Sequence, residues 1–150
     1  MPSNPRQKIV ILVGLPGSGK STYLVCLGVT ALSSDAVRLL LTGDETDQTI
    51  HRKVFATLRY LLKQRLAIGK PVTYIDATHL TRWERRPYLK LAELYNCDVE
   101  AVFFDVPPET CRERNRRRNR VVPEDVMERM AAKLAPPTTE EGFSKITVIN

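Results

Sequence analysis

The segment from Gly14 to Ser21 has the sequence GLPGSGKS and matches the pattern G-x-x-x-x-G-K-[ST]. A short β-branched apolar run, Lys8 to Val13, precedes it, and a helical stretch from about Lys20 to Val29 follows it. A strand, a glycine-rich turn and a helix in this order are the context in which the pattern forms a phosphate-binding loop, or P-loop. The sequence therefore predicts a buried parallel strand that ends at such a loop.

The residues of the loop have separate expected tasks. Glycines let backbone N–H groups surround a phosphate, and the helix N-terminus adds the positive end of its dipole. Lys20 is expected to reach the β- and γ-phosphates, and the Ser21 hydroxyl to ligate Mg²⁺. Because the sequence contains no N-K-x-D guanine-reading motif, ATP with Mg²⁺ is the expected cofactor pair. The residues expected to bind ATP here are Gly14, Pro16, Gly17, Ser18, Gly19, Lys20, Ser21 and Thr22.

Strand-like and helix-like runs alternate along the rest of the chain. The expected strands are 8–13, 31–34, 72–75, 98–106 and 145–149, and the expected helices are 20–29, 35–41, 48–68, 82–95, 109–118 and one that opens at 123–125. Pro87 should kink its helix, and Trp83, Phe103 and Phe104 are expected in the core. This alternation predicts a P-loop NTPase-type three-layer α/β/α domain with a mostly parallel sheet of about four to five strands.

Composition limits the alternatives. The chain has 150 residues, 43% of them apolar, and a net charge of +6, which predicts one domain over residues 1–150 rather than a disordered chain. The longest wholly apolar run is far shorter than the ~20 residues of a membrane helix, and residues 1–5 resemble no signal-peptide core. Three cysteines without paired or metal-ligand spacing favour a reducing compartment. We therefore expect a cytoplasmic protein with no membrane association.

Arginine is concentrated in one short stretch. Six arginines and one glutamate lie between Arg112 and Arg120. Arginine guanidinium groups match phosphate oxygens, so a polyphosphate or a nucleic acid is an expected partner, although a solvated helix face is the alternative. Arg114, Arg117 and Arg118 share a helical face before an Asn119-Arg120 connection. This layout predicts an Arg-rich helical lid over approximately residues 109–134, with solvent exposure left open for Arg112, Arg116 and Arg120.

Three further residues are candidates for the acceptor side of a phosphate transfer. Asp35 and Arg38 lie three residues apart on a short helix, where a carboxylate could take a proton and an arginine could hold a phosphate. A local i,i+3 ion pair explains the same spacing equally well. Asp76 ends an apolar strand and is either an acceptor-pocket residue or a turn residue. His51 and His79 are expected to be structural, although His79 is near enough to Asp76 to line a pocket.

Four segments taken together, GLPGSGKST, SSDAVR, YIDATHL and RERNRRRNRVVPEDVMERM, resemble the kinase domain of the polynucleotide 5′-kinase family, within the P-loop phosphotransferase superfamily. The resemblance extends from about Lys8 to Met130. It implies transfer of the ATP γ-phosphate to a 5′-hydroxyl end of DNA or RNA. The residues that it implies are Asp35 as general base, Arg38 on the acceptor 3′-phosphate, Asp76 in the acceptor pocket, Lys20 and Ser21 on the triphosphate and Mg²⁺, and Arg114 and Arg118 on the ATP phosphates.

The sequence leaves three functions open. The first is this kinase, with a nucleic-acid end as substrate and Lys20, Asp35, Arg38 and Arg118 as catalytic residues. The second is a P-loop kinase of a nucleoside, sugar or other small metabolite. The third is a nucleotide-dependent nucleic-acid-binding protein without kinase activity. No D-x-D-x-T phosphatase motif occurs in the sequence, so phosphatase activity is not expected from this chain.

Overall fold

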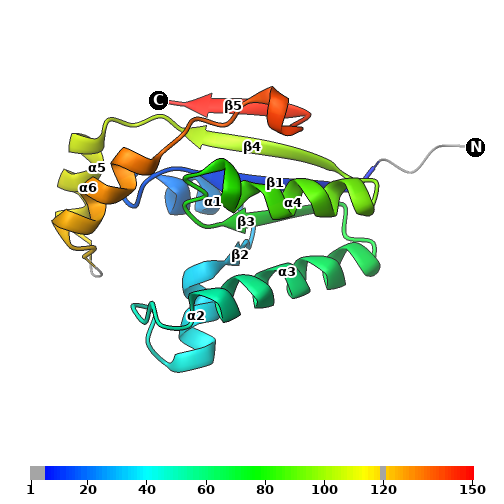
Figure 1. Cartoon of the computed structure of the whole chain (residues 1–150), viewed down its shortest axis with the longest axis horizontal. Helices are drawn as coiled ribbons and strands as arrows, with labels where there is room; N and C mark the ends of the chain where they lie inside the picture. The colour runs from blue at the N-terminus through cyan, green and yellow to red at the C-terminus, as the bar shows by residue number, and fades with distance from the viewer. Residues whose placement is uncertain (1–5, 119–120) are drawn as a thin grey trace, which may run out of the picture.

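The computed structural model describes residues 6–118 and 121–150, and its centre is a five-stranded parallel sheet (Figure 1). Every pairing in this sheet is parallel, in the order β2-β3-β1-β4-β5. The strands are β1 Lys8–Val13, β2 Leu32–Ser33, β3 Val72–Asp76, β4 Asp98–Phe104 and β5 Lys145–Ile149. The sheet confirms the predicted α/β class. Its five strands agree with the predicted number of about four to five.

Helices cover both faces of the sheet, which gives the predicted three layers. Alternate residues of β1 separate the two sides: Ile9 and Ile11 pack with side chains of α3 and α4, and Leu12 packs with Leu24 of α1. Since β1 is buried on both faces, it needs the continuous apolar run that its sequence supplies. The helices are α1 Lys20–Leu27, α2 Ser34–Thr42, α3 His51–Ala67, α4 Arg82–Leu94, α5 Pro108–Arg116 and α6 Glu124–Lys133, with a 3₁₀ turn η1 at Thr139–Glu141.

The helices α5 and α6 lie together at the end of the sheet where β1 and β4 terminate (Figure 1). They share a separate apolar cluster in which Cys111 of α5 and Met127 of α6 pack with Leu15 of the P-loop and Leu80. This cluster fixes the Arg-rich helix directly against the loop that follows β1.

Several element boundaries differ from the sequence prediction. The first helix ends at Leu27, because Gly28 adopts the left-handed conformation (φ +69°) that terminates helices. The helix α2 begins at Ser34, and Ser33 rather than Ser34 or Asp35 caps it, since the Ser33 hydroxyl accepts a hydrogen bond from the Ala36 N–H at 3.2 Å. The helix α5 ends at Arg116 instead of 118, and the predicted connection at 119–120 lies outside the described residues.

Of the three aromatic residues predicted to lie in the core, one lies on the surface instead. Trp83 is 74% exposed on α4, and the Arg86 guanidinium lies 5.1 Å from the centre of its ring. Trp83 occupies the second position of an amphipathic helix whose buried face is carried instead by Arg85 and Tyr88. Phe103 and Phe104 are buried as predicted. The helix continues through Pro87, and the kink expected there stays a prediction.

Two composition-based expectations can be compared with the structure. Within residues 6–118 and 121–150, none of the helices combines the length and the apolar character that crossing a membrane requires. The three cysteines are free: Cys26 is exposed, whereas Cys97 and Cys111 are buried.

Candidate active site

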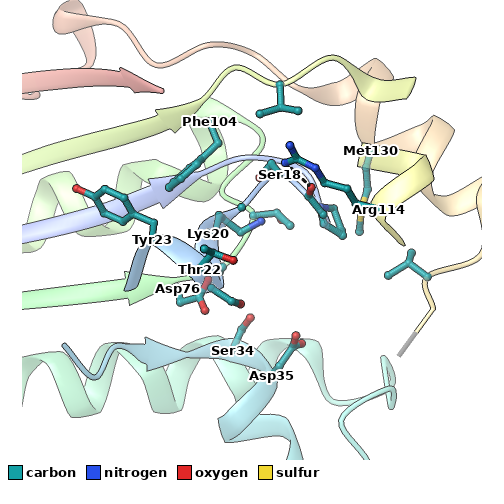
Figure 2. Close-up of a pocket in the computed structure, with 18 of the residues that line it drawn as sticks. Ser18, Lys20, Thr22, Tyr23, Ser34, Asp35, Asp76, Phe104, Arg114 and Met130 are labelled. Atoms are coloured by element: carbon teal, nitrogen blue, oxygen red, sulfur yellow. Dashed lines mark hydrogen bonds between the residues drawn. The ribbon is translucent and has the colours of Figure 1, made fainter. Parts of the chain in front are cut away.

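A cavity of about 880 Å³ opens at the carboxyl edge of the sheet (Figure 2). The P-loop and α1 form one wall, α2 and the start of α3 form another, and α5 contributes a third. Every site residue predicted from the sequence lines this cavity except Gly14. Those that line it are Pro16, Gly17, Ser18, Gly19, Lys20, Ser21, Thr22, Asp35, Arg38, Asp76, Arg114 and Arg118.

Gly14 is buried beneath the loop and has a structural task. Its N–H donates to the Thr78 carbonyl at 3.0 Å, which fixes the point where β1 turns into the loop. A Cβ atom at this position would lie 2.6 Å from the Ser18 hydroxyl oxygen and 3.0 Å from Cβ of Phe104. The first glycine of the motif therefore permits close packing under the loop, and its expected part in ATP binding stays a prediction.

Two other glycines of the loop adopt the left-handed conformation. Gly19 (φ +105°) is the N-cap of α1, so the free N–H groups of the helix start at the floor of the cavity. Gly17 (φ +82°) faces α5 so closely that an added Cβ would lie 2.6 Å from the Cys111 carbonyl oxygen. These conformations create the anion-binding turn that the motif predicts.

The Lys20 side chain is held against the loop itself. Its ammonium donates to the carbonyls of Gly14 at 2.8 Å and Leu15 at 2.9 Å. Burial lowers the pKa of Lys20 to about 8, against the opposing charge of Asp76 and with help from Arg118. A cation thus lies where the motif places one for the terminal phosphates of a nucleotide.

Asp76, at the end of β3, lies among the charges of the cavity. Burial raises the pKa of its carboxyl group; Lys20 and Arg118 act in the opposite direction, while Asp35 adds to the increase. Asp76 therefore lies within electrostatic reach of both the P-loop lysine and the acid of α2. Figure 2 shows Asp76 between Lys20 and the Ser34–Asp35 turn.

The structure shows the local ion pair between Asp35 and Arg38, and the acceptor role of these two residues stays a prediction. The Arg38 guanidinium donates to the Asp35 carboxylate at 3.1 Å, which is the local ion pair. Both residues also line the cavity opposite the P-loop. The Arg38 side chain is only 5% exposed, and its Nε atom has no hydrogen-bond partner among the residues that the structure describes. Arg38 thus brings a positive charge to the cavity wall, where a guanidinium can attract an anion.

The Arg-rich helix separates its arginines into two groups. Arg114 and Arg118 line the cavity, and Arg114 donates to the Gly17 carbonyl at 3.4 Å. Arg117 does not share their face, contrary to the prediction: it is 78% exposed and pairs with Glu113 at 3.0 Å. Arg118 lies four residues after Arg114 and shares its face, whereas Arg117 lies four residues after Glu113 and pairs with it on the neighbouring face. Arg116 pairs with Glu124 on the surface.

Asn115 was not identified from the sequence as a site residue. It is buried, its side-chain amide donates to the Val122 carbonyl at 2.7 Å, and its amide oxygen accepts from the Val122 N–H at 3.0 Å. These two hydrogen bonds join the end of α5 to the segment before α6. Nothing in the amino-acid pattern distinguishes this asparagine, because its partner is a backbone group rather than a recognisable side chain.

The two histidines differ in their relation to the cavity. His79 is buried away from it: Nδ1 donates to the Leu12 carbonyl at 2.6 Å, and burial lowers the pKa of the ring to about 4. This confirms the structural role predicted for His79. His51 instead lines the cavity together with Gln48 and Phe55, and the structural role expected for it stays a prediction. The position of α3 across from the P-loop depends on packing between distant segments, which no local motif reveals.

Comparison with known proteins supports the assignment of this chain as a P-loop α/β domain. The family model described as an AAA domain matches residues 9–137. A bifunctional polynucleotide phosphatase/kinase of Schizosaccharomyces pombe is 24% identical over 149 residues, covering 93% of this chain and 33% of that protein. A putative bifunctional polynucleotide kinase/RNA ligase of Autographa californica nuclear polyhedrosis virus is 28% identical over 159 residues, covering 96% of this chain and 21% of that protein.

The chain thus spans about a third or less of the length of these curated relatives. Among solved structures, a gluconokinase from Sinorhizobium meliloti shares the fold with a TM-score of 0.60 and 20% identity, covering 98% of this chain and 83% of that one. With a P-loop, a parallel sheet and a cavity at its carboxyl edge, the chain belongs to this AAA domain family of P-loop proteins, and it is similar in sequence to two bifunctional polynucleotide kinases.

Proposed function

We propose that this chain transfers the γ-phosphate of ATP to the 5′-hydroxyl end of DNA or RNA. The observation that carries the proposal is the position of Asp35 and Arg38, which face the same cavity as Lys20 and the P-loop. A phosphate donor and a hydroxyl acceptor can meet there, on the two sides of one cavity. The similarity to polynucleotide kinases supports a nucleic-acid acceptor.

On the donor side, the backbone of Gly17 to Thr22 and Lys20 would hold the triphosphate. Arg114 and Arg118 would neutralise charge on the transferred phosphate from the wall that α5 forms beside the P-loop. We assign α5 and α6, approximately residues 109–134, as a lid, because both arginines reach the cavity from this segment.

A magnesium ion fits this site on the chemistry of its donors. The exposed Ser21 hydroxyl opens into the cavity beside Lys20, and the Asp76 carboxylate lies nearby. In the described part of the chain, no group of three or more acidic, histidine or cysteine residues could hold a metal by itself. Mg²⁺ suits such a site, because it keeps several waters and takes its other ligands from substrate phosphates. When bound, the ion would supply positive charge to the phosphate oxygens.

On the acceptor side, Asp35 would accept the proton of the 5′-hydroxyl as its oxygen forms a bond to the γ-phosphorus. The bond between the γ-phosphorus and the β,γ-bridging oxygen breaks at the same time, and ADP leaves with that electron pair. Arg38 would hold the acceptor 3′-phosphate, since it lines the cavity beside Asp35. Asp76 would help to orient the acceptor beside Lys20.

The alternative acceptors remain in competition with this proposal. A gluconokinase has the same fold, so the fold alone does not select a nucleic acid over a small metabolite. Salt dependence separates the two: affinity for a single strand falls by about 0.7 log units per log unit of salt for each phosphate neutralised. A steep slope supports the oligonucleotide acceptor, and a slope near that of one phosphate contact supports a metabolite.

We also propose that the protein is located in the cytoplasm. This part of the proposal rests on the free cysteines alone.

The deciding experiment measures label transfer from γ-labelled ATP, with Mg²⁺, to 5′-hydroxyl DNA, 5′-hydroxyl RNA and a mononucleoside 3′-phosphate. We expect labelled nucleic acid, and a rate reduced roughly 10²- to 10⁴-fold in Asp35→Ala. Arg129→Ala on the exposed side of α6 is the matched control, because Arg129 does not line the cavity. ATP binding without any labelled oligonucleotide would refute the acceptor assignment. Unchanged transfer in Asp35→Ala would refute the general base.

A further inference from the structure

The cavity extends beyond the acceptor arginine to the first turns of α3. Gln48, His51 and Phe55 line this part of it, and none of the three takes part in the proposed phosphate transfer. His51 and Phe55 are four residues apart on α3, so their side chains lie on the same helix face. Their ring centres are 4.6 Å apart with an angle of 45° between the planes. Two aromatic rings thus line one wall of the cavity.

The electrostatic interactions between charged side chains indicate the order in which these residues lie along the cavity. Asp35 acts on both Lys20 and Asp76, which places it near the P-loop. Arg38 pairs with Asp35, and among the charges that act on His51 that of Arg38 has the largest effect. The order is therefore P-loop, Asp35, Arg38 and then the aromatic pair. An acceptor strand that runs from a 5′-hydroxyl at Asp35 through a phosphate at Arg38 would next reach the two rings.

The surroundings of the two rings suit the stacking of a nucleobase, and packing within α3 alone does not account for them. Phe55 is half-buried and packs on the apolar cluster of Val37, Val54 and Leu58, which holds its ring in place. His51 is exposed on the cavity side of that ring, and burial together with Arg38 lowers its pKa, which favours the neutral imidazole. Neutral aromatic faces stack on every type of base. Gln48 adds an amide that can donate to or accept from a base edge.

We propose that His51 and Phe55 form a stacking subsite for the nucleobase that follows the phosphate held by Arg38, so that the cavity binds the first two nucleotides of the acceptor. This inference rests on the proposed function and adds a second-nucleotide contact to it. It assigns these two residues to acceptor affinity rather than to chemistry, because neither lies at the reacting atoms.

The test compares three acceptors that each carry a 5′-hydroxyl: a mononucleoside 3′-phosphate, a dinucleotide, and a dinucleotide whose second residue lacks its base. The variants are His51→Ala and Phe55→Leu, the second of which keeps apolar volume while removing the ring. Tyr60→Leu is the matched control, since Tyr60 is an exposed aromatic residue of α3 that does not line the cavity. Values of kcat and KM, and equilibrium binding without ATP, are measured for each acceptor.

We expect KM and Kd of the dinucleotide to rise roughly 5- to 100-fold in both variants, with kcat unchanged. The mononucleoside 3′-phosphate, the abasic dinucleotide and ATP should be unaffected, as should every acceptor with Tyr60→Leu. Equal effects on all three acceptors, or no effect on any, would overturn the subsite. If the unmodified protein binds the dinucleotide no more tightly than its abasic form, the subsite is also refuted. Absence of label on every acceptor, with base-dependent binding retained, would refute only the proposed reaction.

Discussion

At the scale of single residues, the state of Lys20 governs how a nucleotide should bind. Its pKa of about 8 means that the ammonium begins to lose its proton at mildly alkaline pH in the free protein. A triphosphate stabilises the charged form, so ATP affinity should fall as pH rises above about 8, by at most tenfold per pH unit. Titration calorimetry from pH 7 to 9.5 measures this. Lys20→Met should weaken binding and remove the alkaline decrease, whereas Lys8→Met, away from the cavity, should retain it.

His79 should make the protein less stable in acid. Its folded pKa of about 4 is lower than the unfolded value of about 6.5, so between these values the unfolded chain binds a proton that the folded chain does not. The free energy of unfolding should therefore decrease as pH falls from 6.5 towards 4, by about 1.4 kcal/mol per pH unit. Urea unfolding of His79→Asn, a residue that tolerates the left-handed φ of +49° at this position, should have a flatter profile. Parallel profiles for the two proteins would contradict this account.

At the scale of elements, the contact between the P-loop and α5 is closest at Gly17. In Gly17→Ala, the Cβ meets the Cys111 carbonyl oxygen at 2.6 Å, in addition to the ~1–2 kcal/mol cost of the left-handed conformation. Gly69→Ala is the matched control: its φ is +84°, but nothing lies within 4 Å of the added atom. Urea unfolding should show the larger loss for Gly17→Ala, and only this variant should weaken ATP binding, because it displaces α5 and Arg114. Equal losses of stability in the two variants would show that the protein relieves the contact between the new Cβ atom and the Cys111 carbonyl oxygen at little cost.

The sequence predicts some parts of the site and not others, and the difference has a physical cause at each residue. Residues 14–21 are identifiable because one local turn needs specific residue types at fixed spacing, and the structure places all of them but Gly14 and Leu15 in the cavity wall. Arg117 was assigned wrongly because it pairs with Glu113 on the exposed side of the helix, an alternative that spacing alone does not separate from the cavity face. His51 and Phe55 were missed because their place in the cavity follows from how α3 packs against α2, which is a long-range property. Trp83 was misplaced because amphipathic position, not residue type, decides its exposure.

At the scale of the whole molecule, the strand order brings the donor and acceptor sides together. β1 is central and β3 lies beside it, so the P-loop and Asp76 emerge at adjacent strand ends. β2 pairs with β3, and α2 follows β2 directly, which places Asp35 and Arg38 next along the same edge. Carboxyl ends of parallel strands form the ligand-binding edge of such folds. Three segments that are distant in sequence therefore meet in one cavity because of the order of the strands.

The far end of the chain is joined to this arrangement by a buried ion pair. Arg85 of α4 is fully buried, and its guanidinium donates to both carboxylate oxygens of Glu141 in η1, at 2.8 and 3.1 Å. It also donates to the carbonyls of His79, Leu80 and Ala135. Through these contacts one side chain connects α4, the segment after β3 and the approach to β5. The Glu141 side chain is 3% exposed, and its hydrogen bonds with Arg85 and Thr138 help to keep the pKa of its carboxyl group below the usual value despite burial.

Removing one partner of this pair should destabilise the whole chain. Arg85→Met leaves a buried carboxylate and three carbonyls without their donor, so we expect a loss of about 3–5 kcal/mol in the free energy of unfolding. Replacing both partners, Arg85→Met with Glu141→Met, should cost less than the sum of the single changes, because no unpaired charge then stays buried. Arg129→Ala breaks the exposed pair with Asp125 and should change stability by less than about 1 kcal/mol. Urea unfolding of the four variants measures this cycle. Strict additivity of the two single changes would mean that Arg85 stabilises the protein through the three backbone carbonyls alone.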